Sequence, residues 1–104
     1  MTLWSLKALL EKSPDQVVVL DVRGAESFAA SHIKGAQNIP LADLVSKLGT
    51  LPKDKTIVTY CGDLTCALAP KAALELAQKG FTVRELVGGI DTWTQKGFPI
   101  EKKA

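Results

Sequence analysis

The stretch from Thr56 to Ala73, with the sequence TIVTYCGDLTCALAPKAA, constrains the fold more than any other part of this chain. It opens with β-branched and aromatic residues, which favour a strand, and this pattern stops at Cys61. From Ala69 onward the apolar residues follow the spacing of one helix face, and the helical pattern ends at Gly80. The stretch therefore predicts a strand, a short loop that holds both cysteines, and a helix.

Strand and helix patterns alternate along the rest of the chain. The continuous apolar run Val17 to Leu20 is typical of a strand buried on both faces of a parallel sheet, and Thr82 to Leu86 predicts the last strand. Thr2 or Ser5 is expected to cap the first helix, and the predicted helices span residues 2–10, 25–31, 41–48 and 91–96. With 104 residues there is room for a single core. We therefore expect one α/β domain over residues 1–104, with a mainly parallel sheet and helices on both faces.

Composition and charge exclude several classes of protein. The 13 basic and 11 acidic residues are spread along the chain, which argues against a nucleic-acid partner. No apolar run approaches the roughly 20 residues that span a bilayer, and the amino terminus lacks the order of a signal peptide. We expect no membrane association and a cytoplasmic protein. In that compartment two cysteines indicate catalysis, redox chemistry or metal binding rather than a structural disulfide.

A metal centre is not expected. His32 is the only further residue of the types that structural zinc usually takes as ligands, and such sites need four of them. We therefore expect no metal and no cofactor.

Three marked segments follow predicted strands. In parallel α/β sheets the ligand site lies outside the carboxyl ends of the strands. The segments DVRG, CGDLTC and VGGI, at residues 21–24, 61–66 and 87–90, should therefore meet at one pocket. Gly88 and Gly89 are expected to permit a tight turn there.

The loop after the central strand carries the candidate chemistry. Cys61 is the candidate nucleophile, because a helix amino terminus stabilises a thiolate and bound anions. The backbone amides from Gly62 to Ala67 can form an anion-binding nest. The alternative is a buried, inert cysteine at the end of a strand. Cys66 either resolves a modified Cys61 as a disulfide or packs under the helix.

Four segments in order resemble the rhodanese family, and the resemblance covers essentially the whole chain. They are VVVLDVR, ESFAASHIKGAQNIP, IVTYCGDLTCALAPKAALELAQKGF and VRELVGGIDTWTQKGFPI. The resemblance implies a five-stranded parallel sheet flanked by helices. It also implies that Cys61 accepts sulfur and carries it as a covalent persulfide.

One departure from the family bears on the substrate. Many rhodaneses have an arginine that binds an anionic donor at the position of Cys66, so this chain resembles a subset with two loop cysteines separated by four residues. Asp63 would oppose a dianionic donor such as thiosulfate. We expect weak thiosulfate activity, and we expect the substrate to be bound by Arg23 and by the loop residues Gly62, Asp63, Leu64, Thr65 and Ala67. The missing arginine also argues against phosphatase or arsenate reductase activity in this fold.

Asp21, Arg23 and His32 are the candidate supporting residues. Asp21 either orders the pocket or, as we favour, forms an internal salt bridge or loop hydrogen bond. The alternative for Arg23 is that it supplies the positive charge that the loop lacks. His32 could act as a general base, but a hydrogen-bonding role in the HIKGA turn is favoured.

The sequence thus predicts a sulfurtransferase that passes sulfur from Cys61 to a thiol or another nucleophilic acceptor. Its partners would be a small sulfur donor or a persulfidated protein, and a thiol acceptor. Two alternatives stay open: a partner-dependent sulfur-delivery module without catalysis of its own, and a redox sensor that uses Cys61 and Cys66. We expect a monomer or a weak homodimer.

Overall fold

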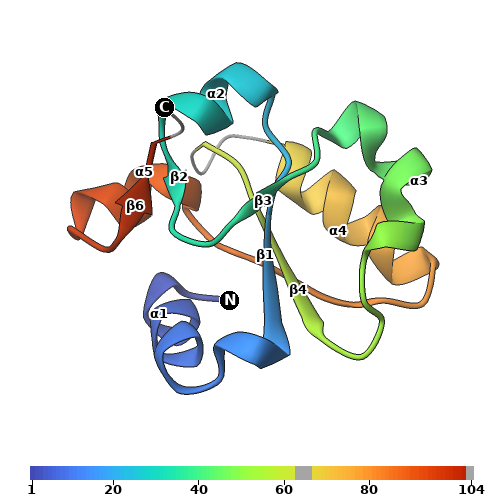
Figure 1. Cartoon of the computed structure of the whole chain (residues 1–104), viewed down its shortest axis with the longest axis horizontal. Coiled ribbons are helices and arrows are strands. Elements are labelled where there is room, and N and C mark those ends of the chain that lie inside the picture. The colour runs from blue at the N-terminus through green and yellow to red at the C-terminus, as the bar shows by residue number, and fades with distance from the viewer. Residues whose placement is uncertain (63–66, 103–104) are drawn as a thin grey trace.

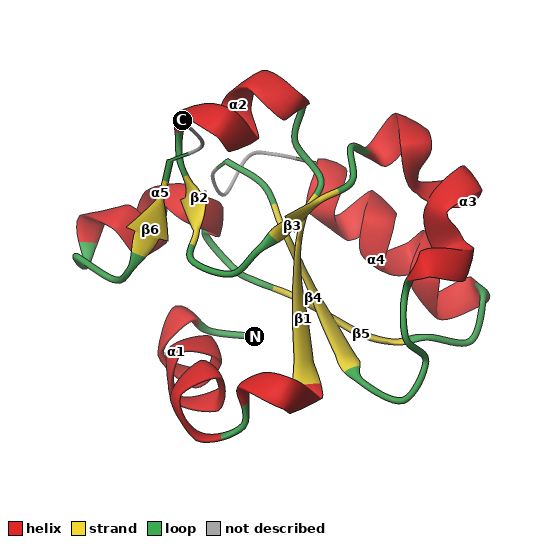
Figure 2. Cartoon of the chain, in the orientation of Figure 1, coloured by secondary structure: helices red, strands yellow, loops and turns green. Residues whose placement is uncertain are grey.

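A computed structural model describes residues 1–62 and 67–102 of the chain. Figure 1 shows a twisted central sheet with helices on both sides and a smaller pair of strands near the carboxyl terminus. The central sheet is parallel, and its strand order is β3-β1-β4-β5. These strands are β1 (Val17–Asp21), β3 (Gln37–Asn38), β4 (Thr56–Tyr60) and β5 (Thr82–Glu85). A separate antiparallel pair is formed by β2 (His32–Ile33) and β6 (Ile100–Glu101), as Figure 2 also shows.

Two apolar cores lie on opposite faces of the central sheet. Side chains alternate along a strand, so Val18 and Leu20 of β1 enter one core while Val17 and Val19 enter the other. The first core is closed by α3 (Leu44–Lys47) and α4 (Leu68–Gln78). The second is closed by α1 (Leu3–Lys12) and α5 (Gly89–Gln95). This double cover explains why the Val17–Leu20 run is apolar at every position.

The register brings the ends of the two central strands to the same edge. Val17 lies opposite Thr56, and Asp21 lies opposite Tyr60. Asp21 is the last residue of β1 and Tyr60 is the last residue of β4, so the chain leaves both strands side by side. This register places the segment after β1, DVRG, and the first loop residues after β4, Cys61 and Gly62, at the same edge of the sheet.

The predicted fold class is confirmed, and the strand from Thr56 to Tyr60 has the predicted bounds. Thr2 caps α1, since its side chain accepts a hydrogen bond from the amide of Ser5 at 3.1 Å. The helix α2 (Ala25–Ala30) also forms where the pattern predicts it.

Two details differ from the prediction. In the described part of the chain, the expected single five-stranded sheet is a four-stranded sheet and a separate two-stranded pair. Beside β5, Met1 makes backbone hydrogen bonds to Glu85 (2.7 Å) and Val87 (2.9 Å), so a single residue holds that outer position. The helix expected over residues 41–48 is a 3₁₀ turn (Leu41–Asp43), the short α3 and a second 3₁₀ turn (Leu48–Thr50).

The segment still turns one apolar face inward, because Leu41, Leu44, Leu48 and Leu51 all pack on the first core. None of the helices in the described ranges is both long enough and apolar enough to cross a membrane.

Candidate active site

Cys61 follows β4 directly and is held in place by the first turn of α5. The amide of Ile90 donates to the carbonyl of Cys61 at 2.9 Å, and the amide of Asp91 donates to the carbonyl of Gly62 at the same distance. Cys61 is 3% exposed and belongs to the core that α4 covers. Its backbone is therefore fixed on two sides, by the sheet and by α5.

Gly89 makes this contact possible. Its φ of +59° lies in the left-handed region, and a β-carbon there would overlap the carbonyl oxygen of Cys61. The sequence identified Gly88 and Gly89 as turn residues but not as part of the support of Cys61. The sequence signal that could have revealed this contact is the Gly-Gly pair that follows the last predicted strand, at the edge of the sheet where ligands bind.

The helix α4 begins shortly after the cysteine loop. Ala67 occupies the N-cap position, where its methyl group cannot accept a hydrogen bond from the first helical amides. The hydroxyl of Thr59 donates to the carbonyl of Ala69 at 3.1 Å, which ties the first turn of α4 to the end of β4. The predicted anion nest thus has a fixed strand end and a fixed helix start. Asp63, Leu64, Thr65 and Cys66 lie outside the described residues, and their predicted roles stay predictions.

Asp21 and Arg23 form a buried ion pair at the end of β1. The Asp21 side chain is fully buried, and its carboxylate accepts from Arg23 Nη2 at 2.7 Å and from Nε at 3.0 and 3.1 Å. The same guanidinium donates to the carbonyl of Ser31. Burial lowers the pKa of Arg23, but the hydrogen bond and charge of Asp21 outweigh it and raise the pKa above its ordinary value. The salt bridge favoured for Asp21 is present, and it occupies two of the three guanidinium nitrogens.

Asn38 and Tyr60 surround this ion pair, and the sequence did not single out either residue. The Asn38 amide donates to the carbonyls of Asp21 (3.1 Å) and Arg23 (3.0 Å), which holds the turn after β1 closed. The Tyr60 hydroxyl accepts from the amide of Ile33 at 3.1 Å. Burial, reinforced by the charge of Asp21, raises the pKa of Tyr60 well above its ordinary value. The available signal was a tyrosine at the end of a predicted central strand, because a tyrosine buried there needs a partner for its hydroxyl.

His32 has the hydrogen-bonding position that the sequence analysis favoured. Its Nδ1 lies 2.8 Å from the carbonyl of Phe28, and its ring stacks on the Phe28 ring with centroids 3.8 Å apart. Its Nε2 lies 4.0 Å from a carboxylate oxygen of Glu101, the residue opposite it in the β2–β6 pair. These contacts assign His32 to the packing of α2 and β6.

Among the residues that the structure describes, no group of three or more His, Cys, Asp or Glu side chains is placed to hold a metal ion. Within the described residues, Cys61 lies between the end of β4 and the start of α4. The nearby ion pair of Asp21 and Arg23 is internally neutralised.

The model of the Rhodanese-like domain family matches residues 2–96. Because this match covers most of the 104 residues, the chain belongs to the rhodanese-like domain family. A solved structure of the BH2092 protein from Bacillus halodurans superposes with a TM-score of 0.93 at 36% identity, over 98% of this chain and 75% of that one.

Two curated relatives differ in length. The "Sulfurtransferase" of Allochromatium vinosum is 31% identical over 83% of this chain and 79% of its own length. The "HTH-type transcriptional regulator Rv0324" of Mycobacterium tuberculosis is 36% identical over 92% of this chain. This chain spans only 42% of that regulator.

Proposed function

We propose that this chain is a rhodanese-like sulfurtransferase in which reduced Cys61 carries one sulfane sulfur from a donor to a thiol acceptor. The family match and the relative named a sulfurtransferase support a role in sulfur transfer. The observation that carries the proposal is the place of Cys61, directly after β4, with its carbonyl bonded to the first turn of α5. The helix α4 starts at Leu68, six residues after Gly62, and the first amides of a helix have no partner within the helix itself, which suits them to bind an anion.

The reaction proceeds by two sulfur-transfer steps without net oxidation. The thiolate of Cys61 attacks the outer sulfur of a donor persulfide, the sulfur–sulfur bond of the donor breaks, and the donor thiolate leaves. Cys61 then carries a persulfide. An acceptor thiolate attacks its outer sulfur, which returns the Cys61 thiolate and forms the acceptor persulfide. Backbone amides of the loop stabilise the anionic persulfide in the same way that they stabilise the thiolate.

A thiol-bound donor fits the charges better than thiosulfate. The loop from Cys61 to Ala67 contains an aspartate and no cation. The Arg23 guanidinium is engaged by Asp21 and Ser31. A dianion would therefore gain little from this site, whereas a persulfide on a small thiol or a protein brings less charge.

Intact mass spectrometry of the reduced chain tests the proposal. We expect a low-molecular-weight persulfide to add one sulfur atom to the wild type and to Cys66→Ser, but not to Cys61→Ser. Thiosulfate should load the protein more slowly. If neither donor loads the wild type, or if Cys61→Ser loads equally well, the proposal is wrong.

A redox sensor is the second candidate, and the two cysteines of the loop, Cys61 and Cys66, support it. Here the Cys61 and Cys66 thiols would give up two electrons to a peroxide and form a disulfide, with release of water. A non-reducing digest of the reduced chain after mild peroxide treatment would contain the crosslinked peptides. If the Cys66→Ser variant responds to peroxide in the same way as the wild type, this candidate fails.

A further inference from the structure

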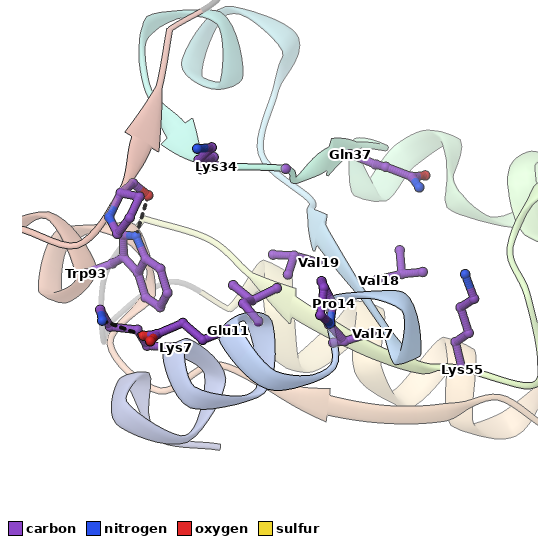
Figure 3. Close-up of a pocket in the computed structure, with 13 residues that line it drawn as sticks. Lys7, Glu11, Pro14, Val17, Val18, Val19, Lys34, Gln37, Lys55 and Trp93 are labelled. Atoms are coloured by element: carbon purple, nitrogen blue, oxygen red, sulfur yellow. Dashed lines mark hydrogen bonds and ion pairs between the residues drawn. The ribbon is translucent and has the colours of Figure 1, made fainter.

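A groove of about 600 Å³ lies along the amino-terminal half of β1, away from the strand ends that hold Cys61. Figure 3 shows Val17, Val18 and Val19 along it, with α1 and Pro14 on one side and the segment of Lys34 and Gln37 on the other. The lining is mainly apolar, and the ring of Trp93 closes one end. None of the residues assigned to sulfur transfer lines this groove.

The edge of β1 that faces the groove has only part of a strand partner. Within the described ranges, β3 pairs with Leu20 and Asp21 but not with Val17, Val18 or Val19. On the other edge, β4 pairs with all five residues of β1. The segment before Gln37 turns away toward β2, so the groove occupies the space where β3 would continue.

The direction of the backbone groups follows from two hydrogen bonds. The amide of Val22, the residue after β1, donates to the carbonyl of Tyr60 and therefore points toward β4. The carbonyl of Asp21 accepts from the amide of Ile39 and therefore points toward β3. Backbone groups point to the two sides alternately along a strand in a parallel sheet. The carbonyl of Val17 and the amide of Val19 therefore face the groove. They can pair with one more extended chain.

Lysine side chains give the groove a positive charge. Lys7 is neutralised by Glu11 at 2.6 Å. Lys34 and Lys55 also line the groove, and in the described part of the chain neither forms an ion pair. Lys34 lies in the turn after β2 and Lys55 just before β4, and Figure 3 shows Val18 and Val19 between their ammonium groups. The charge complements carboxylates rather than cations.

We propose that this groove binds an extended acidic segment of a partner protein, which adds as a strand to the open edge of β1. Main-chain hydrogen bonds to Val17 and Val19 would supply affinity, as in other cases of strand addition. Alternate apolar side chains of the segment would face the valines and Leu10, and its carboxylates would pair with Lys34 and Lys55. This partner site is additional to the sulfur-transfer function and does not depend on it.

Fluorescence anisotropy with a labelled peptide tests the proposal. The probe is a short capped peptide of alternating glutamate and valine. We expect saturable binding to the reduced chain, and loss of binding when the glutamates are replaced by lysine. A peptide methylated on alternate backbone nitrogens should also fail to bind, because it cannot pair with a strand edge. In the complex, the amide resonance of Val19 should shift.

Charge reversal at both lysines, Lys34→Glu with Lys55→Glu, should weaken binding roughly tenfold. The matched control is Lys47→Glu on α3, which is exposed and does not line the groove, and it should change binding less than about twofold. Sulfur loading of Cys61 should be the same in the double variant and the wild type.

Four results would overturn the proposal. Absence of peptide binding would do so directly. Equal binding of the backbone-methylated peptide would exclude strand addition, and equal weakening by Lys47→Glu would indicate a nonspecific charge effect. Equally tight binding of a short oligothymidylate would indicate a general polyanion surface instead.

Discussion

Gly89 lies against the backbone of Cys61 so closely that any side chain at this position would collide with it. A β-carbon built on Gly89 would overlap the Cys61 carbonyl oxygen and lie 2.9 Å from the carbonyl carbons of Cys61 and Gly62. The next residue, Ile90, donates its amide to that same carbonyl oxygen. The start of α5 is therefore a fixed support for the backbone of the proposed nucleophile.

Gly89→Ala should displace Cys61 and slow its loading with sulfur. The alanine would have to adopt a φ of +59° and also push the Cys61–Gly62 backbone away. We expect the free energy of unfolding to fall by more than the roughly 1–2 kcal/mol of the left-handed conformation alone. We also expect the loading rate to fall about tenfold or more, since small displacements of a reacting group are costly. Urea denaturation and mass-detected loading measure the two effects.

Gly97→Ala is the matched control. Gly97 has a φ of +72°, but a β-carbon there would meet no atom within 4 Å. This variant should show the conformational cost in its stability and retain the wild-type loading rate. If both alanine variants load sulfur at the same rate, the support role of Gly89 is wrong.

Arg23→Ala should destabilise the fold through the partner that it leaves behind. The Asp21 side chain is fully buried, so removal of the guanidinium leaves a carboxylate without its main counter-charge. Loss of one partner of a buried pair typically costs about 3–5 kcal/mol. The double variant Asp21→Asn with Arg23→Ala should recover part of this loss, which chemical denaturation measures. If the double variant is no more stable than Arg23→Ala, the buried charge is not the cause.

The same double variant tests whether Arg23 also binds the donor. Its loading rates with thiosulfate and with an uncharged organic polysulfide are compared with those of Asp21→Asn alone. A larger loss with thiosulfate supports the charge role predicted from the sequence. Equal losses would assign Arg23 to the ion pair alone.

Elements with strong periodic patterns were predictable from the sequence, and short ones were not. The β4 strand and the helices α1 and α4 carry enough apolar residues at regular spacing to predict whether each segment is a strand or a helix. The two-residue strands β2, β3 and β6 carry no such pattern. They form because longer elements bring their backbones together, which no local rule detects.

The same distinction holds for the candidate site: features set by neighbouring residues were predictable, and contacts between distant segments were not. The position of Cys61 between a strand and a helix was readable because it depends on residues adjacent in sequence. The contact of Gly89 and Ile90 with the Cys61 backbone joins segments that are distant in sequence. The hydrogen bonds from Asn38 to the turn after Asp21 do the same. Their residue types, glycine and asparagine, are common in ordinary turns, so type alone does not reveal the contact.

His32→Asn should leave sulfur transfer almost unchanged. The Nδ1 atom of His32 is engaged with the Phe28 carbonyl, and its ring is stacked on Phe28. We expect kcat/KM within about twofold of wild type and a loss of stability of about 1–2 kcal/mol from the hydrogen bond and the stacking. The pH dependence of the loading rate should be the same in the variant and in the wild type, because the His32 ring is engaged in packing rather than in proton transfer. A loss of one limb of the profile in the variant would instead indicate a general base.

Tyr60 should make the chain less stable at alkaline pH. It is the only tyrosine, and its pKa is raised by burial and by the charge of Asp21. Above about pH 10 the unfolded chain releases the phenol proton while the folded chain keeps it. The unfolded state then binds fewer protons, so the free energy of unfolding falls with rising pH, by at most about 1.4 kcal/mol per pH unit. Below about pH 10 the phenol is protonated in both states and contributes no pH dependence.

Tyr60→Phe removes this alkaline dependence and lowers the stability at neutral pH. Without the hydroxyl, the buried amide of Ile33 loses its acceptor, which should cost about 1–3 kcal/mol relative to the wild type below about pH 10. Lysines also titrate in the alkaline range, so the informative quantity is the difference between wild type and variant in urea denaturation. That difference should shrink as the pH rises above about 10, because only the wild type loses the contribution of the protonated phenol. Tyrosinate absorbance should appear only together with unfolding; if it develops with an ordinary midpoint in the folded chain, the buried and protonated state assigned to Tyr60 is wrong.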